Sequence, residues 1–286
     1  MTVAIVPTAR SDKTGKIVGA REAARLIRTG DTVAIGGFFG IGLAMEVIHA
    51  LAAIYEETDT EAASFGKPRD LTFVWCVSPG DGQQRGAQRL AQPGLIKRLI
   101  GGHWTAVPAL YQLVAGNQIE GYNIPLGPLS HLYRDIAAGK PGHLSRVGLG
   151  TFADPRFGGG KLNERTTEDL IELMTVGGKE YLFYKAFPIN VALIRGTTAD
   201  TAGNMTMERE ALTVDTLSLA MAAHNSGASS SHRSSASPIW ERSTHARSRS
   251  PARLSTASWW RRPPTTTCRP SPRPTTRPSP PKFASR

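Results

Sequence analysis

Four glycines in one short segment could bring backbone N–H groups against a negatively charged atom. The segment runs from Gly36 to Gly42 and has the spacing Gly37-x-x-Gly40-x-Gly42. Glycine lets a backbone approach a ligand closely, and the N-terminus of a following helix adds partial positive charge, so such a loop can stabilise an oxyanion. A tight turn between a strand and a helix, with positive φ at the glycines, explains the same pattern without any ligand. The spacing alone leaves both interpretations open.

Other chemistries are less favoured by the residues present. A dinucleotide-binding loop has the order G-x-G-x-x-G, whereas the glycine spacing here is reversed, so we reject a nucleotide cofactor site. The histidines show no ligand-pair spacing, and we expect packing or surface roles for them: they are His49, His103, His131, His143, His224, His232 and His245. Arg21, Arg25 and Arg28 have helical spacing and predict a solvated face rather than a phosphate clamp. The sequence therefore predicts no metal site and no tightly bound cofactor.

The segments that must position the loop alternate between strands and helices. Apolar runs predict strands at 32–35, 71–77, 95–101, 119–123, 181–187 and 191–196. Helical spacing predicts helices at 19–28, 43–55, 107–115, 129–138 and 211–223. This alternation indicates an α/β fold, with an open, mainly parallel sheet covered by helices.

Two further segments follow predicted strands and border the same edge of the expected sheet. These are Ser78–Gly82 and Gly101–Trp104. Ligands in open α/β sheets bind at the carboxyl ends of the strands, so both segments could line one cleft with the glycine loop. Ordinary loop geometry explains them equally well.

The composition changes abruptly at Gly227. Residues 1–227 carry equal numbers of basic and acidic groups, whereas residues 228–286 contain 12 basic residues and a single acid, Glu241. Arg, Ser, Pro and Thr supply 42 of the 59 tail positions without any structural period. Too few apolar groups are present to offset the entropy of ordering this segment. We therefore predict one α/β domain over 1–227 and a disordered tail over 228–286.

Cysteine usage and hydropathy indicate the compartment. Cys76 and Cys268 are the only cysteines, which gives no disulfide framework and fits a reducing environment. No window reaches the roughly 18 apolar residues of a membrane span, and the N-terminus has no signal-peptide pattern. We expect a cytoplasmic protein that does not contact a membrane.

The glycine loop belongs to a longer segment that resembles a known family signature. Residues 30–42 resemble the N-terminal pattern of the family I CoA-transferases, in which a strand ends in Gly-Gly-Phe and is followed by three residues, a glycine, one residue and a proline. The sequence departs from this pattern at Ala44, where the proline is expected, and at Thr29, where Asp or Asn is usual. Longer segments resemble the acetate/propionate CoA-transferase branch, over 101–104, 122–127, 130–132, 134–141, 145–152, 166–174 and 181–200. The resemblance covers essentially all of residues 14–227.

The resemblance implies an activity and a site. Family members move CoA between a short-chain acyl-CoA, such as acetyl-CoA or propionyl-CoA, and a carboxylate acceptor, in short-chain fatty acid or ketone body metabolism. They use a glutamate that forms an anhydride and then carries CoA as a glutamyl thioester, so CoA is a substrate and not a resident cofactor. The resemblance assigns Gly37, Phe38, Gly40 and Gly42 to the oxyanion, acyl or CoA site.

The same resemblance implies that part of the enzyme lies outside this chain. Two α/β domains form one enzyme, fused in this branch, and family chains are roughly twice as long as this one. The glutamate belongs to the second half and no Glu here occupies its motif, so we expect no catalytic residue in this chain and negligible activity alone. The intact family member is expected to be a homo-oligomer.

The tail itself is consistent with a shifted reading frame. One permitted codon spelling of residues 228–238, read two bases later, gives Ile-Val-Ile-Ala-Gln-Val followed by Lys-Arg, which resembles the family's next strand and turn. One lost base near Gly227 explains this reading. Without that strand, the sheet edge would expose unpaired backbone groups, and we expect poor solubility.

Two other functions compete with the enzyme fragment. The basic tail could bind nucleic acid through phosphates, with Trp240, Trp259 and Trp260 stacking on bases. Such affinity should fall steeply with salt and disappear when residues 228–286 are deleted, and we expect no specific nucleic-acid partner. The chain could also be an α subunit that awaits a separate β subunit, which a neighbouring β gene would indicate.

Overall fold

The computed structural model describes residues 3–5, 17–56, 67–200, 203–226 and 237–242. Contacts between residues divide the chain into a compact unit over Met1–Arg249 and a second unit over Ser250–Arg286. Every described residue belongs to the first unit. Trp259 and Trp260, on which the nucleic-acid hypothesis partly depends, lie outside the described residues.

The centre of the molecule is an eight-stranded sheet in the order β2-β1-β13-β10-β3-β4-β5-β6. Its strands are β1 (Val3–Ile5), β2 (Ile17–Gly19), β3 (Thr32–Ile35), β4 (Leu71–Trp75), β5 (Ile96–Gly101), β6 (Glu120–Asn123), β10 (Val191–Gly196) and β13 (Ser237–Arg242). The six strands from β13 to β6 are parallel, and β1 is antiparallel to both of its neighbours. The predicted open, mainly parallel α/β sheet is confirmed.

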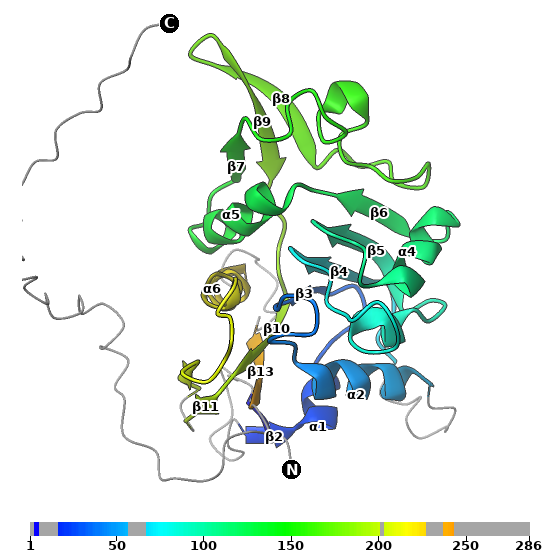
Figure 1. The fold of residues 1–286 in the computed structure, drawn as a ribbon, viewed down its shortest axis with the longest axis vertical. Helices are drawn as coiled ribbons and strands as arrows, with labels where there is room; N and C mark the ends of the chain where they lie inside the picture. Colours follow the sequence, from blue (N-terminus) through cyan, green and yellow to red (C-terminus); the bar gives the residue numbers. More distant parts are fainter. Residues whose placement is uncertain (1–2, 6–16, 57–66, 201–202, 227–236, 243–286) are drawn as a thin grey trace, which may run out of the picture. The chain divides into compact units, whose positions relative to one another are not determined.

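Helices cover both faces of this sheet (Figure 1). They are α1 (Ala20–Ala24), α2 (Met45–Glu56), α4 (Pro108–Ala115), α5 (Leu126–Ala137) and α6 (Thr216–Ser226), with short 3₁₀ helices η1 (Ala87–Leu90) and η2 (Pro155–Phe157). Successive strand residues point to opposite faces. Val33 and Ile35 therefore pack in one core with α1, α2 and α4, whereas Ala34 packs in the other with α5 and α6.

Two helices are shorter in the structure than the apolar pattern of the sequence predicts. The helix expected over 19–28 ends at Ala24, with Arg25 as its C-cap. The helix expected over 211–223 begins only at Thr216, because Val214 has a φ of 34°, which is incompatible with a right-handed helix. Among the described helices, none combines the length and apolar character needed to cross a bilayer.

A second, three-stranded antiparallel sheet has the order β7-β9-β8, with β7 (Gly142–Ser145), β8 (Ile171–Val176) and β9 (Lys179–Lys185). The strand predicted at 181–187 therefore exists, but it is not in the parallel sheet. The turn Gly177–Gly178 has positive φ at both residues and folds β8 back on β9, a local pairing that the α/β interpretation did not consider. A two-stranded ribbon, β11 (Thr198–Ala199) and β12 (Met205–Thr206), follows β10.

The tail contributes β13 to the large sheet, which differs from the prediction of disorder after Gly227. Ser237–Arg242 pairs in parallel with β10 and in antiparallel with β1. Without a partner, this edge of β10 would present unpaired backbone N–H and C=O groups, and an extended segment can pair with such groups whatever its side chains. Pro238 in β13 has no N–H to donate to this pairing. The expected exposed edge at β10 is therefore wrong. The rest of the tail lies outside the described residues.

Candidate functional site

The glycine loop connects the carboxyl end of β3 to the N-terminal end of α2, as predicted. The N–H of Gly36 donates to the carbonyl of Leu193 on β10, at 2.9 Å, which fixes the start of the loop. Phe38 and Ile41 then exchange backbone hydrogen bonds of 2.9 Å each and close a tight tip. The side chains of Phe38 and Ile41 are exposed. Because the amides of Gly36, Phe38 and Ile41 are already bonded, the loop amides left to meet a ligand are those of Gly37, Phe39, Gly40 and Gly42.

The structure separates the glycines that the turn requires from one that it does not. Gly37 has a φ of 125°, and a Cβ atom there would lie 2.5 Å from Leu43 Cδ2 and 2.8 Å from the Ile41 carbonyl oxygen. Gly42 has a φ of 68°, a left-handed conformation that also favours glycine over other residues. At Gly40, φ lies outside the left-handed region and a Cβ would have nothing within 4 Å. The turn explains Gly37 and Gly42, whereas Gly40 leaves open space beside the loop.

The loops after β4 and β5 meet the glycine loop, as the order of the strands requires. The ring of Phe39, a non-glycine residue with a φ of 51°, contacts the His103 ring edge-to-face with centroids 5.2 Å apart. The Oγ of Ser78, which is fully buried, lies 2.9 Å from His103 Nδ1. Thr105 Oγ1 lies 3.2 Å from His103 Nε2. Ser78 and His103 therefore form a fixed polar pair at the carboxyl ends of β4 and β5.

Packing accounts for the two glycines before His103. An added Cβ at Gly101 would lie 2.7 Å from Trp75 Nε1, and one at Gly102 would lie 2.5 Å from the Cys76 carbonyl oxygen. These segments were predicted from the sequence, but the individual residues Phe39, Ser78 and His103 were not. The signal available in the sequence was that each of these residues follows a predicted strand. Their mutual contacts were not predictable, because these depend on which strands are neighbours in the sheet.

Cys76 is not a candidate nucleophile. The thiol is buried, and this burial, together with the nearby Asp215 carboxylate, raises the pKa of Cys76 well above its usual value. Thiolate is the reactive form of cysteine, so Cys76 stays protonated and unreactive at neutral pH.

Asn123 completes the same edge at the carboxyl end of β6. Its backbone N–H donates to the Gly160 carbonyl at 2.7 Å. Its side-chain Oδ1 is buried and has no hydrogen-bond partner among the described residues. A buried amide oxygen without a donor is unfavourable, so a group brought by a ligand or another polypeptide would stabilise it.

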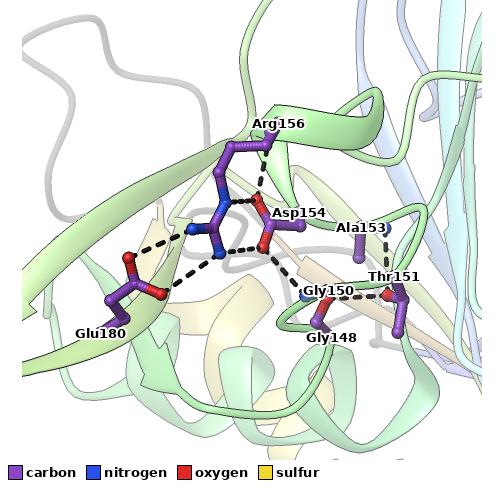
Figure 2. A network of polar contacts seen from close by, with 7 residues as sticks. All are labelled: Gly148, Gly150, Thr151, Ala153, Asp154, Arg156 and Glu180. Carbon is purple, nitrogen blue, oxygen red and sulfur yellow. Dashed lines mark hydrogen bonds and ion pairs between the residues drawn. The ribbon is translucent and has the colours of Figure 1, made fainter.

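The loop that reaches Asn123 is held by a buried carboxylate. Figure 2 shows Asp154, whose side chain is fully buried, accepting from the N–H of Gly150 at 2.9 Å and from that of Arg156 at 3.1 Å. The Arg156 guanidinium also donates to Asp154, through Nε at 2.9 Å and Nη2 at 2.7 Å, and contacts Glu180 on β9. The hydrogen bonds from Arg156 hold the pKa of Asp154 well below its usual range. The carboxylate fixes a loop that has many glycines and little regular structure.

This low pKa gives a pH-dependent prediction for Asp154→Asn. A depressed folded-state pKa adds stability above the unfolded value of about 3.9, and that stability is lost as pH falls through the folded-state pKa. We expect the variant to be about 2 kcal/mol less stable than the parent at pH 7, and the difference to shrink below about pH 4. Urea unfolding between pH 3 and 7 measures this, with the exposed Asp70→Asn as control. A difference that stays constant with pH would contradict the role of the charge.

The remaining predicted residues behave as surface or packing groups. Arg21, Arg25 and Arg28 are exposed, which fits the predicted solvated face. In the part of the chain that the structure describes, no group of three or more His, Cys, Asp or Glu side chains could hold a metal ion.

Several known proteins are similar to this chain. The coenzyme A transferase family model matches residues 18–227. Caffeate CoA-transferase of Acetobacterium woodii is 43% identical over 212 residues, which is 74% of this chain and 39% of that protein. Acyl-CoA transferase YdiF of Escherichia coli O157:H7, solved as a thioester complex with CoA, is 43% identical with a TM-score of 0.69, covering 73% of this chain and 40% of that one. Acetate CoA-transferase subunit alpha of Escherichia coli K12 is 26% identical over 196 residues, which is 68% of this chain and 76% of that subunit.

The chain thus spans about two fifths of the length of the two relatives that are 43% identical to it. The resemblance to the acetate/propionate branch, first drawn from segments such as 30–42 and 122–127, is confirmed by these identities. With the glycine loop at the carboxyl end of β3 and a family match over most of the chain, the protein belongs to the coenzyme A transferase family.

Proposed function

We propose that this chain is the α-type half of an acyl-CoA:carboxylate CoA-transferase, which moves CoA from a short-chain acyl-CoA to a carboxylate acceptor in the cytoplasm. The observation that carries the proposal is the glycine loop, where Gly40 leaves open space beside backbone amides at the carboxyl end of β3. The family match, and a relative solved as a CoA thioester, support the same reaction.

In the proposed reaction a glutamate carboxylate attacks the thioester carbonyl of the acyl-CoA and expels the CoA thiolate. The mixed anhydride that results is attacked by this thiolate at the glutamyl carbonyl, which releases the acyl group as a carboxylate and leaves a glutamyl-CoA thioester. The acceptor carboxylate then repeats both steps in reverse order. Each addition places negative charge on a carbonyl oxygen, and fixed N–H donors stabilise that charge.

In this proposal the chain supplies the donors and the walls of the site. No hydrogen bond joins the Gly40 N–H to another described residue, and its neighbouring space is open, so this amide is the candidate oxyanion donor. The half-buried His103 ring would orient the carboxylate of the acid, because it lies against Phe39 of the loop, and the fully buried Ser78 hydroxyl would hold that ring in place. Gly37 and Gly42 would shape the loop without touching the substrate.

The nucleophilic glutamate would come from a region that the relatives have beyond the matched segment. One source is a separate β subunit, which the similarity to a subunit named alpha supports. The other is the shifted frame that we propose for residues 228–286. Sequencing the coding DNA across codons 225–230 distinguishes them. An intact frame beside a β gene supports the subunit, and a second half in another frame supports the lesion.

A covalent adduct tests the proposed division of labour. We expect the purified chain to form no CoA thioester with acetyl-CoA and to show no transfer to propionate, because it lacks the nucleophile. A hybrid in which residues 18–227 replace the matching segment of E. coli YdiF should transfer CoA and carry a hydroxylamine-sensitive CoA adduct on a glutamate of the E. coli portion. A CoA adduct on the isolated chain, or a folded hybrid without transfer activity, would contradict the proposal.

A further inference from the structure

A loop beside the candidate site exposes several large apolar side chains. Val147 is 55% exposed, Phe152 50% and Phe157 63%. Large apolar groups that gather on one exposed segment mark interaction surfaces more often than isolated ones do. We call these three residues the aromatic loop surface.

The loop is held in one shape, so these side chains are presented rigidly. The Tyr184 hydroxyl donates to the Val147 carbonyl at 2.7 Å and anchors the start. The Gly160 N–H donates to the Phe152 carbonyl at 2.8 Å, and the Phe157 N–H to that of Asp154 at 2.8 Å. The buried Asp154 carboxylate then joins these turns (Figure 2). A surface fixed in advance loses little conformational entropy on binding, and rigid aromatic groups are common binding hot spots.

The aromatic loop surface lies at the edge of the sheet where the candidate site is. The loop returns to β6 through the Gly160 carbonyl, which accepts from Asn123, and through a bridge between Tyr122 and Lys161. β6 lies three strands from β3, about 14 Å at the usual spacing. Phe38 and Ile41, on the glycine loop after β3, are also exposed. Two loops therefore present apolar groups on either side of the Ser78–His103 pair.

We propose that the aromatic loop surface is the docking site for a β-type CoA-transferase half, with Phe152 and Phe157 as its anchors. This inference rests on the proposed function. A polypeptide that delivers a glutamate to the glycine loop must approach this edge, and it would cover the aromatic loop surface and supply the buried Asn123 Oδ1 with a donor. The relatives that are 43% identical contain more than half of their length beyond the matched segment, which is enough chain for a second domain of this size. A second copy of this chain would bring another glycine loop but no nucleophile.

The test is association of the full chain with the portion of E. coli YdiF that it does not match, co-produced as a separate tagged polypeptide. We expect the two to co-purify and to elute together in size-exclusion chromatography. The double variant Phe152→Ser, Phe157→Ser should weaken the complex at least about tenfold, because truncating anchor residues has effects of this size. The matched control is Leu217→Ser, Met221→Ser on α6, which changes two residues that are 66% and 47% exposed. Circular dichroism of each free variant checks that the fold is intact.

Each outcome decides the docking proposal separately from the proposed function. A complex that resists the Phe changes, or that is lost with the α6 control, overturns the docking site even if the complex transfers CoA. Loss of association with the Phe changes alone supports the docking site, whether or not the parent complex transfers CoA. A parent complex that does not transfer CoA would contradict only the proposed function. Failure of the parent chain to associate, or a Phe-dependent homodimer without the E. coli portion, also overturns the docking proposal.

Discussion

Gly37→Ala is expected to destabilise the chain by about 3 kcal/mol or more. The new Cβ would lie 2.5 Å from Leu43 Cδ2 and 2.8 Å from a backbone oxygen, on a residue whose φ of 125° L side chains rarely adopt. Leu43 is itself buried, so it cannot move aside without disturbing the core beside α2. Urea unfolding monitored by circular dichroism measures the loss.

Gly40→Ala is the control for this change, since it lies in the same loop with nothing within 4 Å of an added Cβ. We expect its stability to stay within about 1 kcal/mol of the parent. Equal losses at the two positions would contradict the assignment of Gly37 to the turn and of Gly40 to the open space.

The largest effect on activity is expected from Gly40→Val in the hybrid with E. coli YdiF. A branched side chain would fill the open space beside the loop and keep the reacting carbonyl from the backbone amides. Loss of one oxyanion donor lowers turnover by about 100- to 1,000-fold, and we expect a fall in kcat of this order. Steady-state transfer from acetyl-CoA to propionate measures the change.

Gly19→Val in the same hybrid is the matched control. Gly19 has an extended backbone, and an added Cβ would meet only Glu22 Oε2, at an ordinary 3.7 Å. It lies on β2, four strands from β3, so we expect its turnover to stay near the parent value. A Gly40→Val hybrid with parental turnover would remove Gly40 from the site.

The fold class was predictable because its signals are local. Apolar runs gave the strands that became β3, β4, β5, β6 and β10, and helical spacing gave the helices between them. The small antiparallel sheet was missed for two reasons. The Gly177–Gly178 turn that joins β8 to β9 is a local hairpin signal that the alternating α/β pattern left unused, whereas β7 pairs with β9 through residues too far apart for any short window. β13 was missed because its pairing uses backbone groups, which are the same in every sequence.

The candidate site was likewise predictable from the sequence only in part. The sequence by itself determined the family and the strand, glycine loop and helix that carry the site, since these depend on residues adjacent in the chain. Only the tertiary structure decided that Gly37 is required by the turn whereas Gly40 borders open space, and that Phe39, Ser78, His103 and Asn123 share one edge. The physical reason is that residues far apart in sequence meet only when the strand order places the carboxyl ends of β3, β4, β5 and β6 side by side.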